Sequence, residues 1–209
     1  MTNSKILFRI YNYLFYPERR GIFVHIPKTA GNSVTGVLYG SKFLCIGHDL
    51  RDRNYRFPKD IKWFKDLYSC CFVRNPWDRL VSSYFYLKNG GNSEHDLYDF
   101  NYYFAKFETF DDLIKNWEDS FYNQIHMKPQ SDWIYNEKNE CMFDFVGRYE
   151  NLQKDTNRIM IQNDMLPKYL QKTNNSQRGN YVDYYTKTTS KIVEEIYKED
   201  IENFNYSFI

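Results

Sequence analysis

The sequence predicts an α/β fold in which a mainly parallel central sheet is flanked by helices. Short apolar runs with the composition of strands alternate along the chain with segments of helical periodicity. This alternation is typical of parallel strands joined by helical crossovers. Polar motifs follow two of the runs directly, so we expect a ligand site at the carboxyl ends of the strands. The predicted strands are Ile22–Ile26, Lys42–Ile46, Tyr68–Val73 and Phe143–Gly147.

The bulk properties indicate a single domain over residues 1–209, without internal repeats or a low-complexity tail. The formal net charge is only +1, so no broad field favours nucleic acid, and we expect no nucleic-acid partner. Residues 1–20 mix charged and apolar side chains and are predicted to form an amphipathic extension. They lack the uninterrupted apolar core of a signal peptide or a transmembrane segment.

The cysteines show no Cys-x-x-Cys spacing, and two of them lie next to each other inside an apolar run. Buried, reduced thiols are therefore expected, which favours a reducing compartment and predicts a cytoplasmic location. The cysteines are Cys45, Cys70, Cys71 and Cys141.

The first predicted strand leads into a loop suited to binding an anion. Pro27 closes the strand, because proline has no amide proton for a sheet ladder. Lys28 then adds a full positive charge ahead of the predicted helix Val34–Tyr39, which either Asn32 or Ser33 can cap. Free amides at the start of a helix and the helix dipole both favour a negative ligand. We therefore expect a phosphate site formed by Lys28, Thr29, Ala30, Gly31, Asn32 and Ser33.

The order of residues in this loop separates it from the loop of nucleotide triphosphatases. Their motif places lysine directly after the last glycine, whereas Lys28 precedes Gly31 by three residues. The string His-Ile-Pro-Lys-Thr-Ala-Gly-Asn-Ser instead resembles the 5′-phosphosulfate loop of sulfotransferases that use 3′-phosphoadenosine 5′-phosphosulfate (PAPS). The likeness is greatest to the carbohydrate branch, including the uronyl 2-O-sulfotransferases and related bacterial-type members. It implies the P-loop-like sulfotransferase fold.

A second motif follows the third predicted strand. Asn75 is a natural N-cap and Pro76 suits the first helical position, while five apolar residues then recur with helical spacing. The pattern Arg-x-Pro-x-x-Arg-x-x-Ser resembles the 3′-phosphate-binding element of the same sulfotransferases. That resemblance implies that Arg74 and Ser82, which lies off the apolar stripe, hold the 3′-phosphate of the donor. The apolar stripe is Trp77, Leu80, Val81, Tyr84 and Phe85.

The rest of the chain carries weaker signals. Residues 94–139, with a predicted helix at Asp111–Trp117, are expected to shape the acceptor site. Within them His126-Met127-Lys128-Pro129-Gln130 resembles an element of the same family branch, with a structural or a catalytic role left open. Leu166–Asp183 is predicted to be a loop and Thr188–Asn205 a helix. The loop loosely resembles one that covers the nucleotide, which implies donor contacts for Lys172, Thr173, Ser176, Arg178 and Gly179.

These observations together predict a PAPS-dependent sulfotransferase that acts on a hydroxyl, with a carbohydrate as the expected acceptor and no metal ion. A nucleotide or sugar kinase is the first alternative, but Arg74 stands where a kinase would place an acidic metal ligand. A non-catalytic nucleotide-binding module of the same fold is the second alternative. Neither binding motif reports on the acceptor side.

Lys28 is the first catalytic candidate, because it can reach the oxygen that leaves sulfur. The general base is expected to be a histidine, since a sugar hydroxyl needs a group to take its proton near neutral pH. His25 lies within a strand, and His95 lies in a polar stretch without a motif. His48 directly follows the second predicted strand, a position that the resemblance assigns to the base. His126 is the second candidate.

Overall fold

The computed structural model describes residues 21–39, 43–47, 67–171 and 178–209. Within these ranges the chain forms a four-stranded sheet with the strand order β2-β1-β3-β4, and every neighbouring pair is parallel. The predicted α/β fold with a parallel sheet is therefore confirmed. The strands are β1 (Gly21–Val24), β2 (Phe43–Ile46), β3 (Tyr68–Val73) and β4 (Phe145–Arg148).

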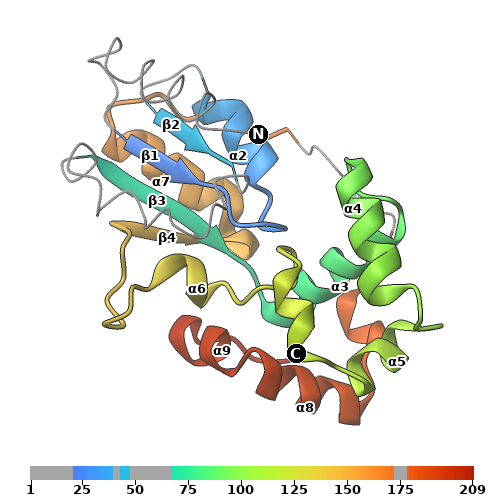
Figure 1. Ribbon diagram of the computed structural model, residues 1–209. Helices are drawn as coiled ribbons and strands as arrows, with labels where there is room; N and C mark the ends of the chain where they lie inside the picture. The colour runs from blue at the N-terminus through green and yellow to red at the C-terminus, as the bar shows by residue number, and fades with distance from the viewer. Residues whose placement is uncertain (1–20, 40–42, 48–66, 172–177) are drawn as a thin grey trace.

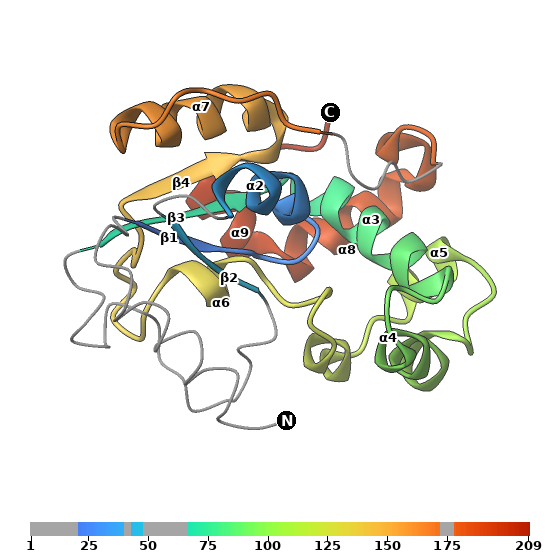
Figure 2. The ribbon, with the colours of Figure 1, turned by 90° about the horizontal axis from the view of Figure 1, so that it is seen from above.

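The two faces of the sheet are covered by different helices, as Figure 2 shows from above. Because side chains alternate along a strand, Phe23 and Phe72 pack on one face while Ile22 and Cys71 pack on the other. The first face is covered by α2 (Gly31–Leu38) and α7 (Leu152–Gln162), and the second by α6 (Ser131–Ile134) and α9 (Lys198–Phe204). Burial on both faces explains why the strands are apolar without alternation.

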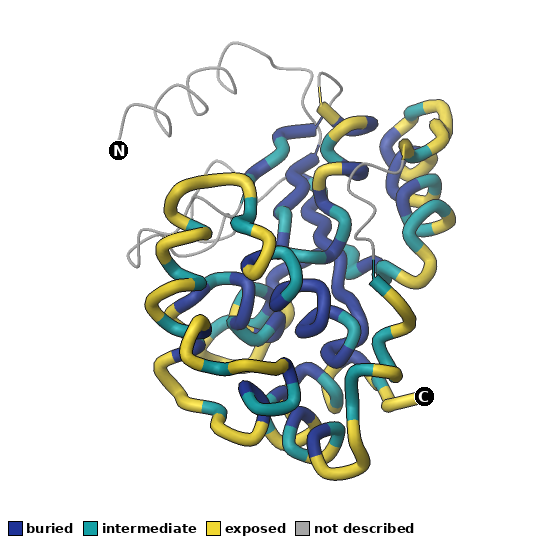
Figure 3. The backbone as a smooth tube through the Cα atoms, turned by 90° about the vertical axis from the view of Figure 1, so that its right-hand side faces the viewer, coloured by how far each residue is buried: buried dark blue, intermediate teal, exposed yellow. Residues whose placement is uncertain are grey.

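A group of helices lies beyond the carboxyl ends of the strands (Figure 1). It has its own core, in which the predicted stripe residues Trp77, Leu80, Val81 and Tyr84 are all buried. Figure 3 shows how the buried residues are concentrated in the middle of the molecule, with the exposed ones on its outer turns. The group comprises α3 (Pro76–Lys88), α4 (Glu94–Asp99), η3 (Phe100–Phe104), α5 (Phe110–Lys115), η4 (Asp119–Asn123) and α8 (Lys187–Ile196), and the remaining short turns are η5 (Tyr149–Asn151) and η6 (Tyr181–Tyr184).

The sequence predicts a single C-terminal helix, and this prediction was wrong. The segment is divided into α8 and α9 at Tyr197. The hydroxyl of Tyr197 donates to the carbonyl oxygen of Met127 at 2.7 Å, which holds this buried residue in place. Just after the break, the buried carboxylate of Asp200 accepts hydrogen bonds from the backbone N–H groups of Gln130 and Ser131. These tertiary contacts redirect the chain without interrupting its apolar periodicity.

Several sequence-based predictions lie outside the described residues. They are the amphipathic extension at residues 1–20, the candidate base His48, and the donor contacts of Lys172, Thr173 and Ser176. In the ranges that are described, none of the helices has the length and apolar composition needed to span a bilayer.

Candidate functional site

The loop after β1 has an unusual backbone. Lys28 and Ala30 both adopt the left-handed conformation, with φ angles of 67° and 64°. Non-glycine residues in that region cost about 1–3 kcal/mol each, so the surrounding structure must hold the loop in place. One of the bonds that do so is local, because the Thr29 hydroxyl donates to the carbonyl oxygen of Ile26 at 2.9 Å.

The helix after this loop begins earlier than the sequence predicts. Ala30 is the N-cap of α2 and no side chain caps it, so the prediction that Asn32 or Ser33 caps this helix was wrong. Both residues lie inside the first turn of α2. The amides of that turn therefore have no side-chain cap, which leaves them suited to an anionic ligand. Gly31 is required here, because a Cβ at this position would lie 1.8 Å from the ring of His25.

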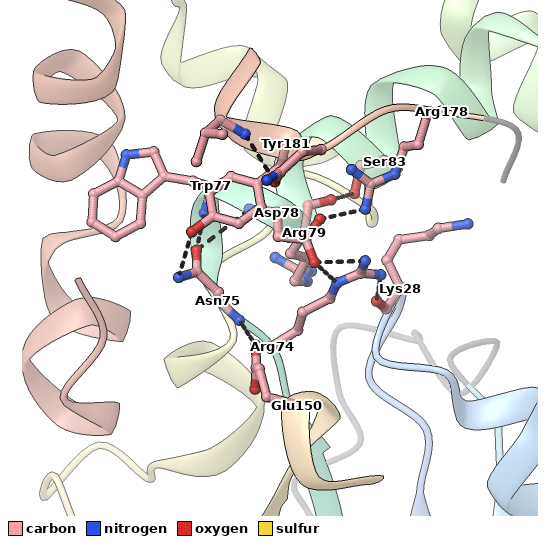
Figure 4. Close-up of polar contacts among 12 residues, drawn as sticks. Lys28, Arg74, Asn75, Trp77, Asp78, Arg79, Ser83, Glu150, Arg178 and Tyr181 are labelled. Atoms are coloured by element: carbon pink, nitrogen blue, oxygen red, sulfur yellow. Dashed lines mark hydrogen bonds and ion pairs between the residues drawn. The ribbon is translucent and has the colours of Figure 1, made fainter. Parts of the chain in front are cut away.

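Two arginines from the second motif bind backbone carbonyls of this loop, and Figure 4 shows the contact between Arg74 and Lys28. Arg74 donates from Nη1 to the carbonyl oxygen of Lys28 at 3.0 Å. Arg79 is 2% exposed, and its Nε donates to the carbonyl oxygen of Pro27 at 3.0 Å. Its Nη1 donates to the carbonyl oxygen of Lys128 at 2.8 Å, which ties the His-x-x-Pro-Gln element to the same loop.

Gln130 explains part of the role of that element. Its side-chain amide pairs with the backbone of Arg74 on both sides, accepting from the N–H and donating to the carbonyl oxygen at 2.9 Å each. The buried carboxylate of Asp200 accepts from the backbone N–H of Gln130 at 2.8 Å. The last residue of this element therefore fixes the chain at the point where β3 ends and Arg74 begins.

Asp78 joins two cationic side chains that the sequence assigns to the donor. Its Oδ2 accepts from Nε and Nη2 of Arg74 at 2.8 and 2.7 Å, and its Oδ1 pairs with Arg178 (Figure 4). The guanidinium of Arg74 also stacks on the ring of Tyr149, 3.8 Å from its centroid. Ser82 is buried one turn after Asp78 on α3, so it faces the same side of the helix. Asp78 thus brings Arg74 and Arg178 together, Ser82 lies one turn farther along α3, and Gly179 follows Arg178 in the chain.

The side chain of Lys28 extends away from the guanidinium of Arg74 (Figure 4) and ends over the ring of Tyr86, 3.7 Å from its centroid. Burial, and then the nearby positive charge of Arg74, lower the pKa of Lys28 to about 8, while Asp96 opposes this change. Asp96 accepts a hydrogen bond from the Tyr86 hydroxyl at 2.9 Å. The pKa of Lys28 is thus closer to neutral pH than that of a free lysine while the group stays mainly protonated at pH 7, and shifts of this kind cluster at functional sites.

The candidate histidines lie in different surroundings. His126 is 4% exposed, with Nε2 at 3.5 Å from Oδ1 of Asp96 and its ring 4.8 Å from that of Tyr86. His25 is half-buried and its ring stacks on Phe23. The side chain of His95 is 82% exposed and lies beside Asp99. Because His48 is outside the described residues, the choice of base stays a prediction.

Sequence reasoning missed four residues of this site: Asp78, Arg79, Tyr86 and Asp96. Arg79 is the second arginine of the Arg-x-Pro-x-x-Arg-x-x-Ser pattern, and Asp78, Ser82 and Tyr86 are spaced four residues apart and so follow one side of α3. Asp96 comes from α4 and could be found only from the folded chain. Among the described residues, no group of three or more His, Cys, Asp or Glu side chains is arranged to hold a metal ion.

Comparison with known proteins relates the chain to one family. The model of the sulfotransferase family matches residues 11–207. An uncharacterised protein of Archaeoglobus fulgidus is 33% identical over 90 residues, which make up 43% of this chain and 62% of that relative. The similarity thus spans less than two thirds of the relative's length. No solved structure gives a significant match.

Proposed function

This chain belongs to the sulfotransferase family, and we propose that it transfers a sulfuryl group from PAPS to the hydroxyl of an acceptor, a carbohydrate. The observation that carries the proposal is the pair of anion sites at neighbouring strand ends. One consists of the Lys28 loop and the uncapped start of α2, and the other of Arg74 and Arg178 around Asp78. Such an arrangement suits a nucleotide with phosphates at both its 5′ and 3′ positions.

The proposed reaction is an in-line displacement at sulfur. The acceptor oxygen forms a bond to sulfur while the bond from sulfur to the 5′-phosphate oxygen breaks. The electron pair of the broken bond stays on that oxygen, and adenosine 3′,5′-bisphosphate leaves. The ammonium of Lys28 and the amides of the first turn of α2 stabilise the charge that grows on the leaving oxygen. A base, His48 or His126 in this proposal, takes the proton of the acceptor hydroxyl.

Support for a carbohydrate acceptor comes from the motifs, which are most similar to those of the carbohydrate branch. The proposal also places the enzyme in a reducing compartment, the cytoplasm. Burial raises the pKa of the Cys70 and Cys71 thiols well above the usual range, so both remain protonated and unreactive there. Arg74 and its ion pair with Asp78 occupy the end of β3, which weighs against a kinase because an acidic metal ligand is expected at that point.

The proposal is tested by incubating the full chain with 35S-labelled PAPS and a panel of acceptors in excess EDTA. The panel holds uronic acid-containing polysaccharides, simple glycosides and a phenol. We expect label in a carbohydrate, with turnover unaffected by EDTA, since lysine and backbone amides can neutralise a sulfuryl group without magnesium. Transfer from γ-labelled ATP with a strict magnesium requirement would establish a kinase instead. Binding of the bisphosphate without transfer to any acceptor would favour the non-catalytic module.

A further inference from the structure

Tyr86 and Asp96 form a supported platform under the ammonium of Lys28. The ring of Tyr86 lies 3.7 Å from Nζ, within the range of a cation–π interaction. The hydroxyl of Tyr86 donates to Oδ2 of Asp96 at 2.9 Å. The same oxygen accepts from the backbone N–H of Asn92 and from the hydroxyl of Ser93, both at 3.0 Å. The ring is therefore held from behind by a carboxylate that is itself fixed at the start of α4.

The position of this platform relates it to the donor site. Tyr86 lies on α3 one turn beyond Ser82 and two turns beyond Asp78, on the side of the helix that faces the loop. Asp78, Ser82 and Tyr86 form a row along α3. Lys28 connects the two ends of this row, because its carbonyl oxygen accepts a hydrogen bond from Arg74, the partner of Asp78, while its ammonium reaches Tyr86. The platform thus stands at the end of the row farther from the proposed 3′-phosphate site, and α4 begins the segment expected to shape the acceptor site.

We propose that Tyr86 and Asp96 are positioning residues for Lys28: the aromatic ring seats the ammonium, and the carboxylate fixes the ring and supplies negative charge beside it. Without this platform, a long and flexible lysine side chain would sample many rotamers before reaching the leaving oxygen. The catalytic part of this inference rests on the proposed function. The geometric part, in which the two residues hold the lysine, does not.

The charges around Lys28 explain why a carboxylate is needed there. The nearby positive charges of Arg74, Arg178 and Arg79 disfavour the charged form of Lys28, whereas the negative charge of Asp96 on α4 favours it. Asp96 is able to do so because it stays ionised. Burial alone would raise its pKa, but hydrogen bonds from His126, Asn92, Tyr86 and Ser93 hold the pKa of Asp96 well below its usual range. Tyr86 remains a donor, since burial and the bond to Asp96 raise its pKa to about 12.

The experiment measures the protonation of Lys28 directly, without an assay of activity. The full chain is labelled with trace acetic anhydride across a pH series, and acetylation of Lys28 relative to the exposed Lys138 is followed by peptide mass spectrometry. Only the neutral amine reacts, so the midpoint reports the pKa of Lys28, about 8 in the native chain. Asp96→Asn and Tyr86→Leu are expected to move the midpoint to lower pH, and Tyr86→Phe, which keeps the ring, to move it less. Glu94→Gln and Tyr98→Phe are matched controls on α4 that should leave it unchanged.

Each variant is first shown to be folded by its circular dichroism spectrum and thermal transition. If Asp96→Asn leaves the midpoint unchanged, the proposed electrostatic role of Asp96 is wrong. If Tyr86→Leu leaves it unchanged, the proposal that the ring of Tyr86 positions the ammonium is wrong. In the sulfation assay, Tyr86→Leu should lower kcat by about tenfold to hundredfold with little change in donor KM, the scale of a misplaced catalytic group. If the native chain transfers no sulfate but the midpoints move as expected, the proposed function fails and the positioning contact stands.

Discussion

Arg74 donates a hydrogen bond from Nη1 to the carbonyl oxygen of Lys28 across 3.0 Å, joining residues that are 46 positions apart. The bond connects the end of β3 to the strained loop after β1. The backbone of Arg74 is held in turn by the buried side chain of Gln130. The two proposed phosphate sites are therefore connected by a direct hydrogen bond between their loops.

Replacing Arg74 with alanine should weaken binding of adenosine 3′,5′-bisphosphate by about 2–5 kcal/mol, the range for leaving a buried anion without its partner. Isothermal titration calorimetry measures this loss. Arg158→Ala, an exposed arginine on α7, is the matched control and should bind normally. An equal loss in affinity for adenosine 5′-monophosphate would contradict the assignment of Arg74 to the 3′-phosphate.

Replacing Lys28 with alanine should lower kcat by about 10²–10³-fold, the scale for removing one preorganised donor at a developing charge. Donor affinity should fall much less, because the amides of α2 and the arginines remain. Steady-state kinetics at saturating donor separates the two effects, with the exposed Lys154→Ala on α7 as control. Normal turnover at saturation combined with weak donor binding would make Lys28 an anchor only.

The pH dependence of the reaction should report the charge of Lys28. The protonated form is the active one, and its pKa in the free protein is lowered to about 8, so kcat/KM should decline as the pH rises through about 8. Bound phosphate groups favour the ammonium, so the corresponding decline in kcat should occur at higher pH. A pH–rate profile that stays flat from pH 7 to the point of alkaline unfolding would exclude this role.

The assignment of the general base is tested by a pair of substitutions. His48→Ala should lower the sulfation rate by about 10²–10⁴-fold and leave bisphosphate binding intact. His126→Ala is the comparison, because this buried histidine contacts Asp96 and carries the only other base assignment we propose. Near-normal turnover in His48→Ala together with a large loss in His126→Ala would transfer the role to His126.

The sheet and the helix after β3 were predictable because their signals are local. Tyr68–Val73 is a short apolar run with the observed bounds of β3, and Asn75 accepts hydrogen bonds from the N–H groups of Trp77 and Asp78 as an N-cap should. The start of α2 was not predictable, since nothing in the sequence shows that Ala30 adopts a left-handed conformation. The break at Tyr197 depends on a hydrogen bond to Met127, a residue far away in the chain.

The donor side of the site was easier to predict than the rest for a similar reason. Arg74 directly follows β3 and Lys28 lies in the short loop after β1, so the parallel sheet brings them to the same edge. Asp96 is contributed by a short helix in a segment without a readable motif, and its contact with Tyr86 exists only in the folded chain. Likewise, the buried guanidinium of Arg79 is held by hydrogen bonds to the carbonyl oxygens of Pro27 and Lys128, which lie in separate segments of the chain.

The central claim, that the chain binds a nucleotide through separate 5′- and 3′-phosphate sites, is tested most directly by calorimetric titration with adenosine 3′,5′-bisphosphate and with adenosine 5′-monophosphate. Arg74 and Arg178, which both pair with Asp78, are the proposed 3′-phosphate site, which the monophosphate has no group to fill. We predict that the bisphosphate binds at least about 30-fold more tightly, since hydrogen bonds to charged groups contribute about 1.5–3 kcal/mol each. Equal affinities for the two nucleotides would contradict the account.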